Sequence, residues 1–269
     1  AWRDPRLRAL ADDAFRMAVD AVLDASVDFV LIAGDLFNTA LPGIDHVNTV
    51  VSELSRLRDA GIPVYLIAGS HDYSPTGKTM LSVLETAGLC TNVFKGEVRD
   101  EQLHLDFTVD PGTGAKLTGI LGKAGQLDSE LYKSLACEPL ELVEGPKIFL
   151  FHTTLDELKP SGWDKVGSQP VSFLPKGFDY YAGGHVHIID DVSLPGYAHV
   201  VYPGPLFPAS FSELEELGHG GLYIVDSEKG YARERVPIKT MDVLAVTEDC
   251  EAKTPSQVEQ ALRERVSGS

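Results

Sequence analysis

The sequence predicts an α/β fold, in which helices cover the faces of a mainly parallel sheet. Two observations support this prediction. Segments with apolar residues at helical spacing alternate with short continuous apolar runs in the first third of the chain, which is the pattern of βαβ units. The chain also has 269 residues, 43% of them hydrophobic, which is enough for one large domain or for one domain and part of another.

The first third of the chain supplies the βαβ units. Apolar residues recur at helical spacing over three segments, so helices are expected there. The two runs between these segments are rich in β-branched and aromatic residues, as buried parallel strands are. Gly61 and Gly88 follow the second and third helical segments and would end them. The expected helices span about residues 6–25, 47–57 and 78–87, and the expected strands span residues 27–33 and 64–68.

The middle of the chain carries a hairpin signal. The turn residues Asp110–Gly114 separate two strand-like segments, which suggests a second sheet with antiparallel character. A later turn at Ser227–Gly230 predicts a closing hairpin, whereas the acidic stretch around Glu213 is expected to form an exposed loop. The strands in this part are expected over residues 103–109, 116–121, 147–151, 178–181, 199–202, 222–226 and 232–238.

Composition narrows the possible functions. The formal net charge of −17 argues against nucleic-acid binding, because neutralising phosphates requires Lys and Arg, but it suits attraction of divalent cations. Cys90, Cys137 and Cys250 match no zinc or redox spacing, and we expect reduced thiols in a cytoplasmic protein. No signal peptide is visible, and no apolar run reaches the roughly 18 residues that a membrane span needs, so no membrane segment is expected.

Four predicted strands end in residue types that bind metals. Because the carboxyl ends of parallel strands meet at one edge of a sheet, these side chains are expected to surround one point. Imidazole and carboxylate together suit a divalent cation, and a carboxylate can bridge two cations that clamp a phosphoryl group. The pattern therefore predicts metal-dependent phosphoester hydrolysis. The residues are Asp35 after the first strand, Ser70 and His71 after the second, His152 after residues 147–151, and His185 and His187 after the double glycine Gly183–Gly184.

These motifs resemble, in order and in spacing, those of the calcineurin-like metallophosphoesterases. Within that family the chain looks most like the SbcD-type nuclease subunit of DNA double-strand-break repair complexes. The resemblance runs from about residue 1 to residue 236, and it rests on residues 28–38, on the motif Gly69–Asp72 and on Tyr202–Gly204. It implies a four-layer αββα sandwich, manganese as the metal, and DNA phosphodiesters as the substrate.

The resemblance also implies a role for each residue of the site. His71 would be the catalytic residue, which stabilises the transition state or protonates the leaving 3′-oxygen. The other residues would hold two divalent metal ions. The implied ligands are Asp35 as the bridge between both ions, His152 and His185 on the second ion, His187 on the first ion, and Ser70 as a weak ligand where most members have Asn.

Two further features depart from the family pattern. The first strand of the family carries an Asp-x-His that supplies two ligands, and this stretch is absent from the sequence, so the first ion would keep only Asp35 and His187. Asn38 stands where many phosphatases of the family have an Asp that orients the catalytic histidine. Asn38 could hydrogen-bond His71, but it could not stabilise an imidazolium by charge.

The last residues of the chain predict a second unit. Val243–Val246 is expected to form a strand, and a capping box at Thr254–Gln257, with proline at the first helical position, predicts a helix to about Val266. One strand and one helix cannot bury their own apolar faces. Residues 1–238 are therefore expected to be the nuclease domain, and residues 239–269 the start of a small α+β capping domain.

The resemblance implies partners too. They are DNA, which a capping domain helps to engage, and a coiled-coil SMC-like ATPase subunit; a homodimer is also compatible with it. Two other functions stay open. The acidic charge favours a stand-alone phosphatase or a cyclic-nucleotide phosphodiesterase, and the missing ligands favour a scaffold with a vestigial metal site.

Overall fold

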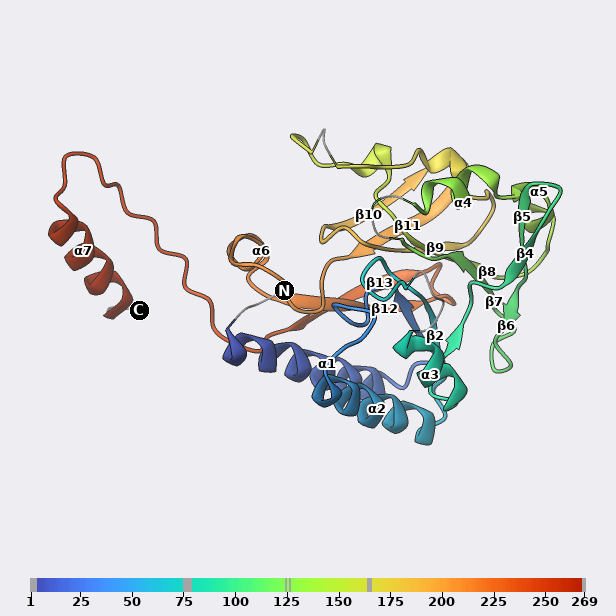
Figure 1. Ribbon diagram of the computed structural model, residues 1–269, viewed down its shortest axis with the longest axis horizontal. Helices are drawn as coiled ribbons and strands as arrows, with labels where there is room; N and C mark the ends of the chain where they lie inside the picture. The colour runs from blue at the N-terminus through green and yellow to red at the C-terminus, as the bar shows by residue number, and fades with distance from the viewer. Residues whose placement is uncertain (1–3, 75–78, 124, 126, 164–165, 268–269) are drawn as a thin grey trace.

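The structure is a computed structural model that describes residues 4–74, 79–123, 125, 127–163 and 166–267. Its described strands form two sheets of three and six strands and two smaller two-stranded pairs. Helices flank the larger elements, so the predicted α/β class is confirmed in its broad form (Figure 1). None of the described helices is long and apolar enough to cross a membrane.

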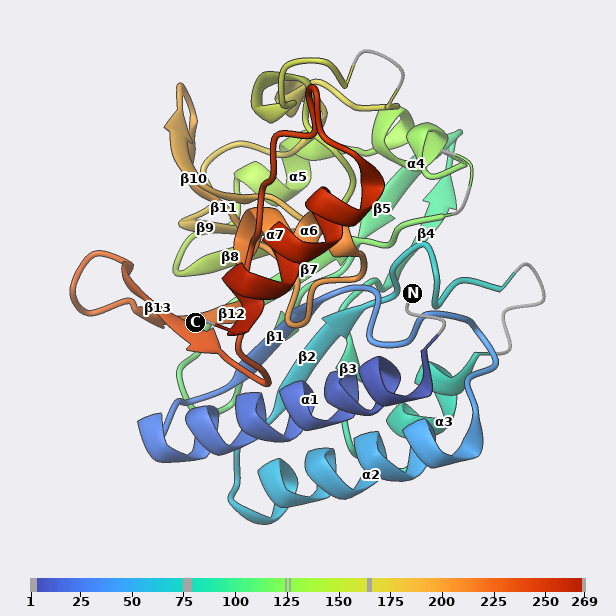
Figure 2. The ribbon, with the colours of Figure 1, turned by 90° about the vertical axis from the view of Figure 1, so that its left-hand side faces the viewer.

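The smaller sheet and its two long helices come from the first third of the chain. Figure 2 shows α1 and α2 lying side by side along this sheet. Asp4 caps α1 by accepting a hydrogen bond from the Arg6 amide at 2.9 Å, and a proline opens the helix. The third helix begins at Met80, where the Thr79 side chain caps it by accepting a hydrogen bond from the Ser82 amide. Residue 78, the expected start, lies outside the described residues. The elements are α1 (Pro5–Ala25), β1 (Val30–Ala33), α2 (Ile44–Asp59), β2 (Val64–Ile67), α3 (Met80–Thr86) and β3 (Thr91–Asn92), and all strand pairs are parallel.

The larger sheet has the order β10-β11-β9-β8-β7-β6. Its four central strands run parallel, and only the two edge strands pair antiparallel. The expected antiparallel character is therefore wrong for the body of this sheet. The expected strand at residues 103–109 is split between β5, which pairs with β4, and β6. The strands are β4 (Gly96–Arg99), β5 (Gln102–Leu105), β6 (Thr108–Val109), β7 (Lys116–Ile120), β8 (Lys147–His152), β9 (Tyr180–Gly184), β10 (Ile189–Leu194) and β11 (Tyr197–Pro203).

Alternation along β2 and β8 shows how the sheets stack, because neighbouring side chains on a strand point to opposite faces. On β2, Leu66 packs in the cluster with α1 and α2, whereas Tyr65 packs in a cluster shared with the larger sheet. On β8, Leu150 packs in that shared cluster, whereas Phe151 packs with the short helices beyond. The shared cluster lies between the two sheets. The short helices are α4 (Ser129–Ser134), α5 (Cys137–Glu141), η2 (Asp156–Leu158) and η3 (Val171–Phe173).

The segment after β11 contains a helix that the sequence did not lead us to expect. Residues 211–217 were expected in an exposed loop, but they form α6 (Phe211–Leu217). Ser210 accepts a hydrogen bond from the Glu213 amide at 3.2 Å, and the Glu213 carboxylate accepts one from the Ala209 amide at 3.0 Å. This is the reciprocal capping pattern of a helix start. The closing hairpin follows as predicted, with β12 (Gly220–Asp226) paired to β13 (Ala232–Ile238).

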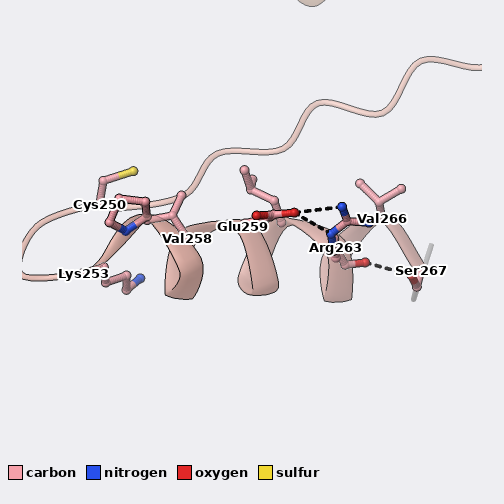
Figure 3. A pocket seen from close by; sticks show the side chains of 9 residues that line it. Cys250, Lys253, Val258, Glu259, Arg263, Val266 and Ser267 are labelled. Carbon is pink, nitrogen blue, oxygen red and sulfur yellow. Dashed lines mark hydrogen bonds and ion pairs between the residues drawn. The ribbon is translucent and has the colours of Figure 1, made fainter.

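The tail confirms the predicted helix but not the predicted strand. Gln257 and Thr254 cap each other, and α7 runs from Pro255 to Ser267. Residues 243–246, all of them described, form no strand, because no second strand lies beside them to pair with their backbone. Figure 1 shows α7 apart from the body, and none of its described residues is buried. A groove of about 820 Å³ lies between the turn at Cys250 and this helix (Figure 3).

Candidate metal centre

The structure brings the ends of both parallel sheets together at one edge. Residues on β1 contact β8 and β9, and residues on β2 contact β8. The residues at these strand ends are therefore neighbours in space, as expected from the carboxyl ends of parallel strands. They are Asp35 after β1, Ser70 and His71 after β2, His152 as the last residue of β8, and His185 just beyond β9.

Asp35 and His152 form the centre of this group. His152 is only 1% exposed, and its Nδ1 lies 2.7 Å from the Ala33 carbonyl oxygen. A carbonyl can only accept, so Nδ1 carries the proton, and a neutral imidazole then has a bare lone pair on Nε2. That Nε2 is buried without a hydrogen-bond partner, 3.3 Å from Oδ2 of Asp35. With a neutral imidazole, two acceptors thus face each other, and a proton on Nε2 or a bound cation would relieve the contact.

The pKa values of this pair shift as that geometry requires. Burial alone would lower the pKa of His152, but the Asp35 carboxylate outweighs it and the pKa is raised. Burial alone would raise the pKa of Asp35, but His152 and then the His71 amide lower it on balance. Each group therefore favours a positive charge at the shared position. A proton or a divalent cation can supply it.

The backbone around Asp35 is shaped for close approach. Oδ1 of Asp35 accepts a hydrogen bond from the His71 amide at 2.9 Å, which ties the β1 and β2 ends together. Asp35 itself has a φ of 54°, in the left-handed region that non-glycine residues seldom adopt. A Cβ at Gly69 would stand 2.1 Å from Oδ1 of Asp35, and a Cβ at Gly34 would stand 2.3 Å from Nδ1 of His152. Only glycine fits at these two positions.

His185 lies next to His152 and has an exposed side chain. Its ring centroid lies 5.1 Å from that of His152, and its φ of 86° is again left-handed. Such backbone conformations cluster at functional sites, where the surrounding structure holds them. Partial burial, and then the neighbouring His152, lower the pKa of His185 to about 4. At neutral pH the imidazole is uncharged, which is the form that binds metals.

His187 is held by a residue that was expected in an exposed loop. Nδ1 of His187 lies 2.7 Å from Oε2 of Glu213 on α6. Burial would raise the pKa of Glu213, but the Ala209 amide and His187 lower it, so the carboxylate is charged. The carboxylate accepts a hydrogen bond from Nδ1–H of His187, which leaves the Nε2 lone pair available for a ligand. The Ser210-x-x-Glu213 capping signal could have shown that Glu213 belongs to a helix start.

His71 and Asp72 sit together after β2 but differ in environment. His71 is exposed, and its Nδ1 lies 3.2 Å from the backbone carbonyl of Asn38. Asn38, which could hydrogen-bond His71 by its position in the sequence, makes this contact through its main-chain carbonyl. Asp72 is 1% exposed and accepts hydrogen bonds from the amides of Leu36, Phe37 and Gly69. Asp72 therefore fixes the loops that carry Asp35 and His71.

The described residues make a partial centre. No group of three or more His, Cys, Asp and Glu side chains in the described part of the chain could hold a metal ion as it stands. Ser70 is half-buried beside the group. The donor chemistry nevertheless fits a divalent cation, because an orphaned buried imidazole nitrogen faces a carboxylate and a neutral imidazole lies next to it.

Comparison with known proteins agrees with this chemistry. The chain belongs to the calcineurin-like phosphoesterase family, which residues 10–188 match. It is 28% identical over 263 residues to the DNA double-strand break repair protein Mre11 of Methanopyrus kandleri, a match that covers 94% of this chain and 56% of that protein. It is also 28% identical over 232 residues to the uncharacterized metallophosphoesterase YhaO of Bacillus subtilis, covering 84% of this chain and 52% of that protein.

The chain spans about half the length of the curated relatives it matches. Among solved structures, the crystal structure of TT1561 of Thermus thermophilus superimposes with a TM-score of 0.52 at 18% identity. That match covers 84% of this chain and 93% of TT1561. At this identity it supports the fold alone.

Proposed function

We propose that the chain is the catalytic part of a metal-dependent phosphodiesterase of nuclease type, which hydrolyses DNA with two divalent ions, preferably Mn²⁺. The observation that carries the proposal is the pair of acceptors at Asp35 and His152, which face each other across 3.3 Å without a hydrogen bond. The similarity to proteins named as DNA double-strand break repair proteins favours DNA as the substrate.

The proposed ligands divide between two ions. Asp35 would be shared by both ions, and His152 and His185 would hold one of them. His187 would hold the other with its free Nε2, while Ser70 would be a weak neutral ligand. Bound divalent ions would supply Lewis-acid polarisation of the phosphate and a nucleophilic water at neutral pH.

His71 is the proposed catalytic residue. It is exposed at the rim, and its Nδ1 proton points to the Asn38 carbonyl, so Nε2 is left to face the substrate. A proton held on Nε2 would pass to the leaving 3′-oxygen, or would stabilise charge on the phosphate as it reacts. The Asn38 carbonyl keeps the ring oriented, and a main-chain contact of this kind does not depend on the side chain at position 38.

The proposal extends to the organisation of the chain. Residues 1–238 would form the nuclease domain, an αββα sandwich whose middle is the core between the two sheets. Residues 239–269 would be the beginning of a capping domain, since α7 is helical but has no described residue buried against the body. DNA and a coiled-coil ATPase subunit are the proposed partners, and a second copy of the chain is a further one.

Two other functions each have one observation in their favour. The net charge of −17 favours a small phosphate ester over a polyanion, as in a stand-alone phosphatase or a cyclic-nucleotide phosphodiesterase. The lack of a complete three-residue metal group among the described residues favours a non-catalytic scaffold.

Degradation of end-labelled duplex DNA by the full-length protein with Mn²⁺, beside hydrolysis of bis(p-nitrophenyl) phosphate, separates these functions. The His71→Ala variant should lose at least about a hundredfold in turnover, the scale of a general acid, while it keeps its metal. The matched control is His104→Ala on β5, outside the site. Activity on the small ester alone would indicate a phosphatase. No hydrolysis of either substrate, with metal bound, would indicate a scaffold.

A further inference from the structure

A fifth parallel strand ends at the same edge of the fold, and its end was not among the predicted site residues. Strand β7 pairs in parallel with β8, with Ile120 opposite Phe151, and it continues into Leu121, Gly122 and Lys123. The Gly122 amide donates a hydrogen bond to the Ala68 carbonyl at 2.9 Å, so this segment joins the larger sheet to the end of β2. Lys123 therefore lies at the rim of the candidate centre.

Gly122 also places Lys123 close to His152. A Cβ at Gly122 would stand 2.3 Å from Cδ2 of His152, so the chain passes directly against that imidazole ring. Asp128, only 5% exposed, fixes the segment on its other side. Burial raises the pKa of Asp128, while its own backbone amide, the charge of His152, and the backbone amide and charge of Lys123 act in the opposite direction. The Lys123 segment is thus anchored on both sides.

The Lys123 ammonium forms no ion pair within the described chain, although its charge acts on the nearby Asp128 carboxylate. Its Nζ lies 5.6 Å from the centroid of the Tyr73 ring, and Tyr73 is the second residue after His71. Both side chains are half-buried. No salt bridge joins Lys123 to any residue of the described chain, although 40 residues of the sequence are acidic. A cation–π contact orients an ammonium but leaves its charge available.

We propose that Lys123 binds a substrate phosphate next to the phosphate that is cut, with Tyr73 holding the ammonium in position. The inference rests on the proposed phosphodiesterase function and specifies a polymeric substrate for it. Lysine binds phosphate as a compact point charge with three donors. An acidic chain that acts on a polyanion needs its positive charge placed at the site, and Lys123 is placed there. On this proposal a substrate with a single phosphate makes no contact with Lys123.

The test compares Lys123→Gln with wild type in the full-length protein, on a single-stranded oligonucleotide and on bis(p-nitrophenyl) phosphate. For the oligonucleotide, KM should rise about tenfold, the scale of one charge-assisted hydrogen bond, with kcat unchanged. The slope of log KM against log salt should fall by about 0.7, as for one lost phosphate contact on a single strand. The kinetics on the small ester should not change.

Matched variants define the controls. Lys229→Gln removes the same charge from the turn between β12 and β13 and should leave both substrates unaffected. Lys123→Arg should restore most of the oligonucleotide KM, and Tyr73→Leu should raise it by less than Lys123→Gln does. A drop in kcat on both substrates would overturn the proposal, because Lys123 would then support the centre itself. Unchanged KM on the oligonucleotide would overturn it as well.

Failure of the phosphodiesterase proposal can be distinguished from failure of the Lys123 proposal. If wild type cleaves neither substrate with Mn²⁺ bound, the phosphodiesterase proposal fails. The Lys123 contact is then measured by the fluorescence anisotropy of a labelled oligonucleotide, which needs no turnover. Weaker binding and a smaller salt slope in Lys123→Gln would still support the contact. Equal slopes for variant and wild type, or no binding by either, would refute it.

Discussion

A single hydrogen bond decides the chemistry of His152. The Ala33 carbonyl accepts a hydrogen bond from Nδ1–H of His152, and the lone pair on Nε2 is thereby aimed at Asp35. A buried acceptor without a donor costs about 1–3 kcal/mol, and this one is placed against a negative charge. Such a cost is tolerated where a bound ligand supplies the missing partner. The arrangement is therefore better explained by a ligand-binding role than by packing.

Glu213 should affect the centre through His187, although its carboxylate also accepts a hydrogen bond from the Ala209 amide at the start of α6. Glu213→Ala removes the acceptor that fixes the His187 ring, and loss of such a partner typically lowers metal affinity or activity about 10–100-fold. Titration with Mn²⁺ by calorimetry, together with turnover, would measure this. Glu213→Gln keeps an acceptor oxygen and should lose less. Glu216→Ala, exposed on the same helix, is the control, and an equal loss in both alanine variants would contradict the assignment.

Among single residues, the sequence suggested five members of the centre, because each follows a recognisable strand. They are Asp35, His71, His152, His185 and His187. Glu213 and Lys123 were missed for different reasons. Glu213 reaches His187 from a helix 26 positions along the chain, and such a long-range contact leaves no local pattern. Lys123 does follow a predicted strand, but a lysine is not a metal-ligand type and its proximity to Tyr73 is visible only in three dimensions.

Among the elements, the turn between β6 and β7 depends on one buried carboxylate. Asp110 is 1% exposed, and it accepts hydrogen bonds from the Tyr65 hydroxyl at 2.8 Å and from the Thr113 amide at 2.7 Å. Burial raises the pKa of Asp110, but these donors outweigh it and the pKa is lowered on balance. The charged form is thus favoured by the fold, and it joins the smaller sheet to the larger one.

Asp110→Asn should destabilise the protein by about 1–3 kcal/mol near neutral pH, because the donors lose their charged acceptor. A lowered folded-state pKa gives stability that is present above the unfolded value of about 3.9 and is lost as pH falls through the folded value. The difference in unfolding free energy between variant and wild type should therefore shrink below about pH 4. Urea unfolding at several pH values would measure it.

The control for this turn is Asp106→Asn, an exposed aspartate just before β6. It should leave the free energy of unfolding unchanged at every pH. The difference in unfolding free energy between Asp110→Asn and wild type could instead stay constant into the acid range. The Asp110 charge would then contribute nothing to stability.

Elements with strong local signals were predicted well. The apolar runs at β2 and β8 formed because both faces of each strand are buried. The periodic helices α1 and α2 formed because each buries one apolar face. The four-residue run at 243–246 did not form a strand, because a strand needs a partner that no sequence window contains. Strand β10 was also missed, since its alternating half-exposed residues give little apolar signal.

For the whole molecule, metal binding should appear as a gain in stability. An ion that binds only the folded state at about 100 times its Kd adds about 2.7 kcal/mol, which corresponds to a rise in Tm of roughly 5 °C or more. Mn²⁺ should therefore raise the Tm of wild type, and a chelator should reverse the rise. Asp35→Ala should abolish the whole rise and bind neither ion, because the carboxylate is shared between both.

An exposed aspartate, Asp24→Ala on α1, is the matched control and should keep the full rise in Tm. Mass spectrometry under native conditions would count the ions in each protein. One ion retained at full occupancy in Asp35→Ala would contradict a bridging carboxylate, and an unchanged rise in Tm would place the metal elsewhere on the protein.

The glycines around the Asp35–His152 pair keep open the space that the side chains of the centre occupy. Gly69 and Gly34 contribute no atoms to it, yet a single methyl group at either would fall within 2.3 Å of a site atom. A ligand such as Ser70 can be exchanged for another oxygen donor at some loss, whereas these two positions admit no alternative. Redesign of this centre for another ion would therefore have to vary the side chains and leave the backbone clearance untouched.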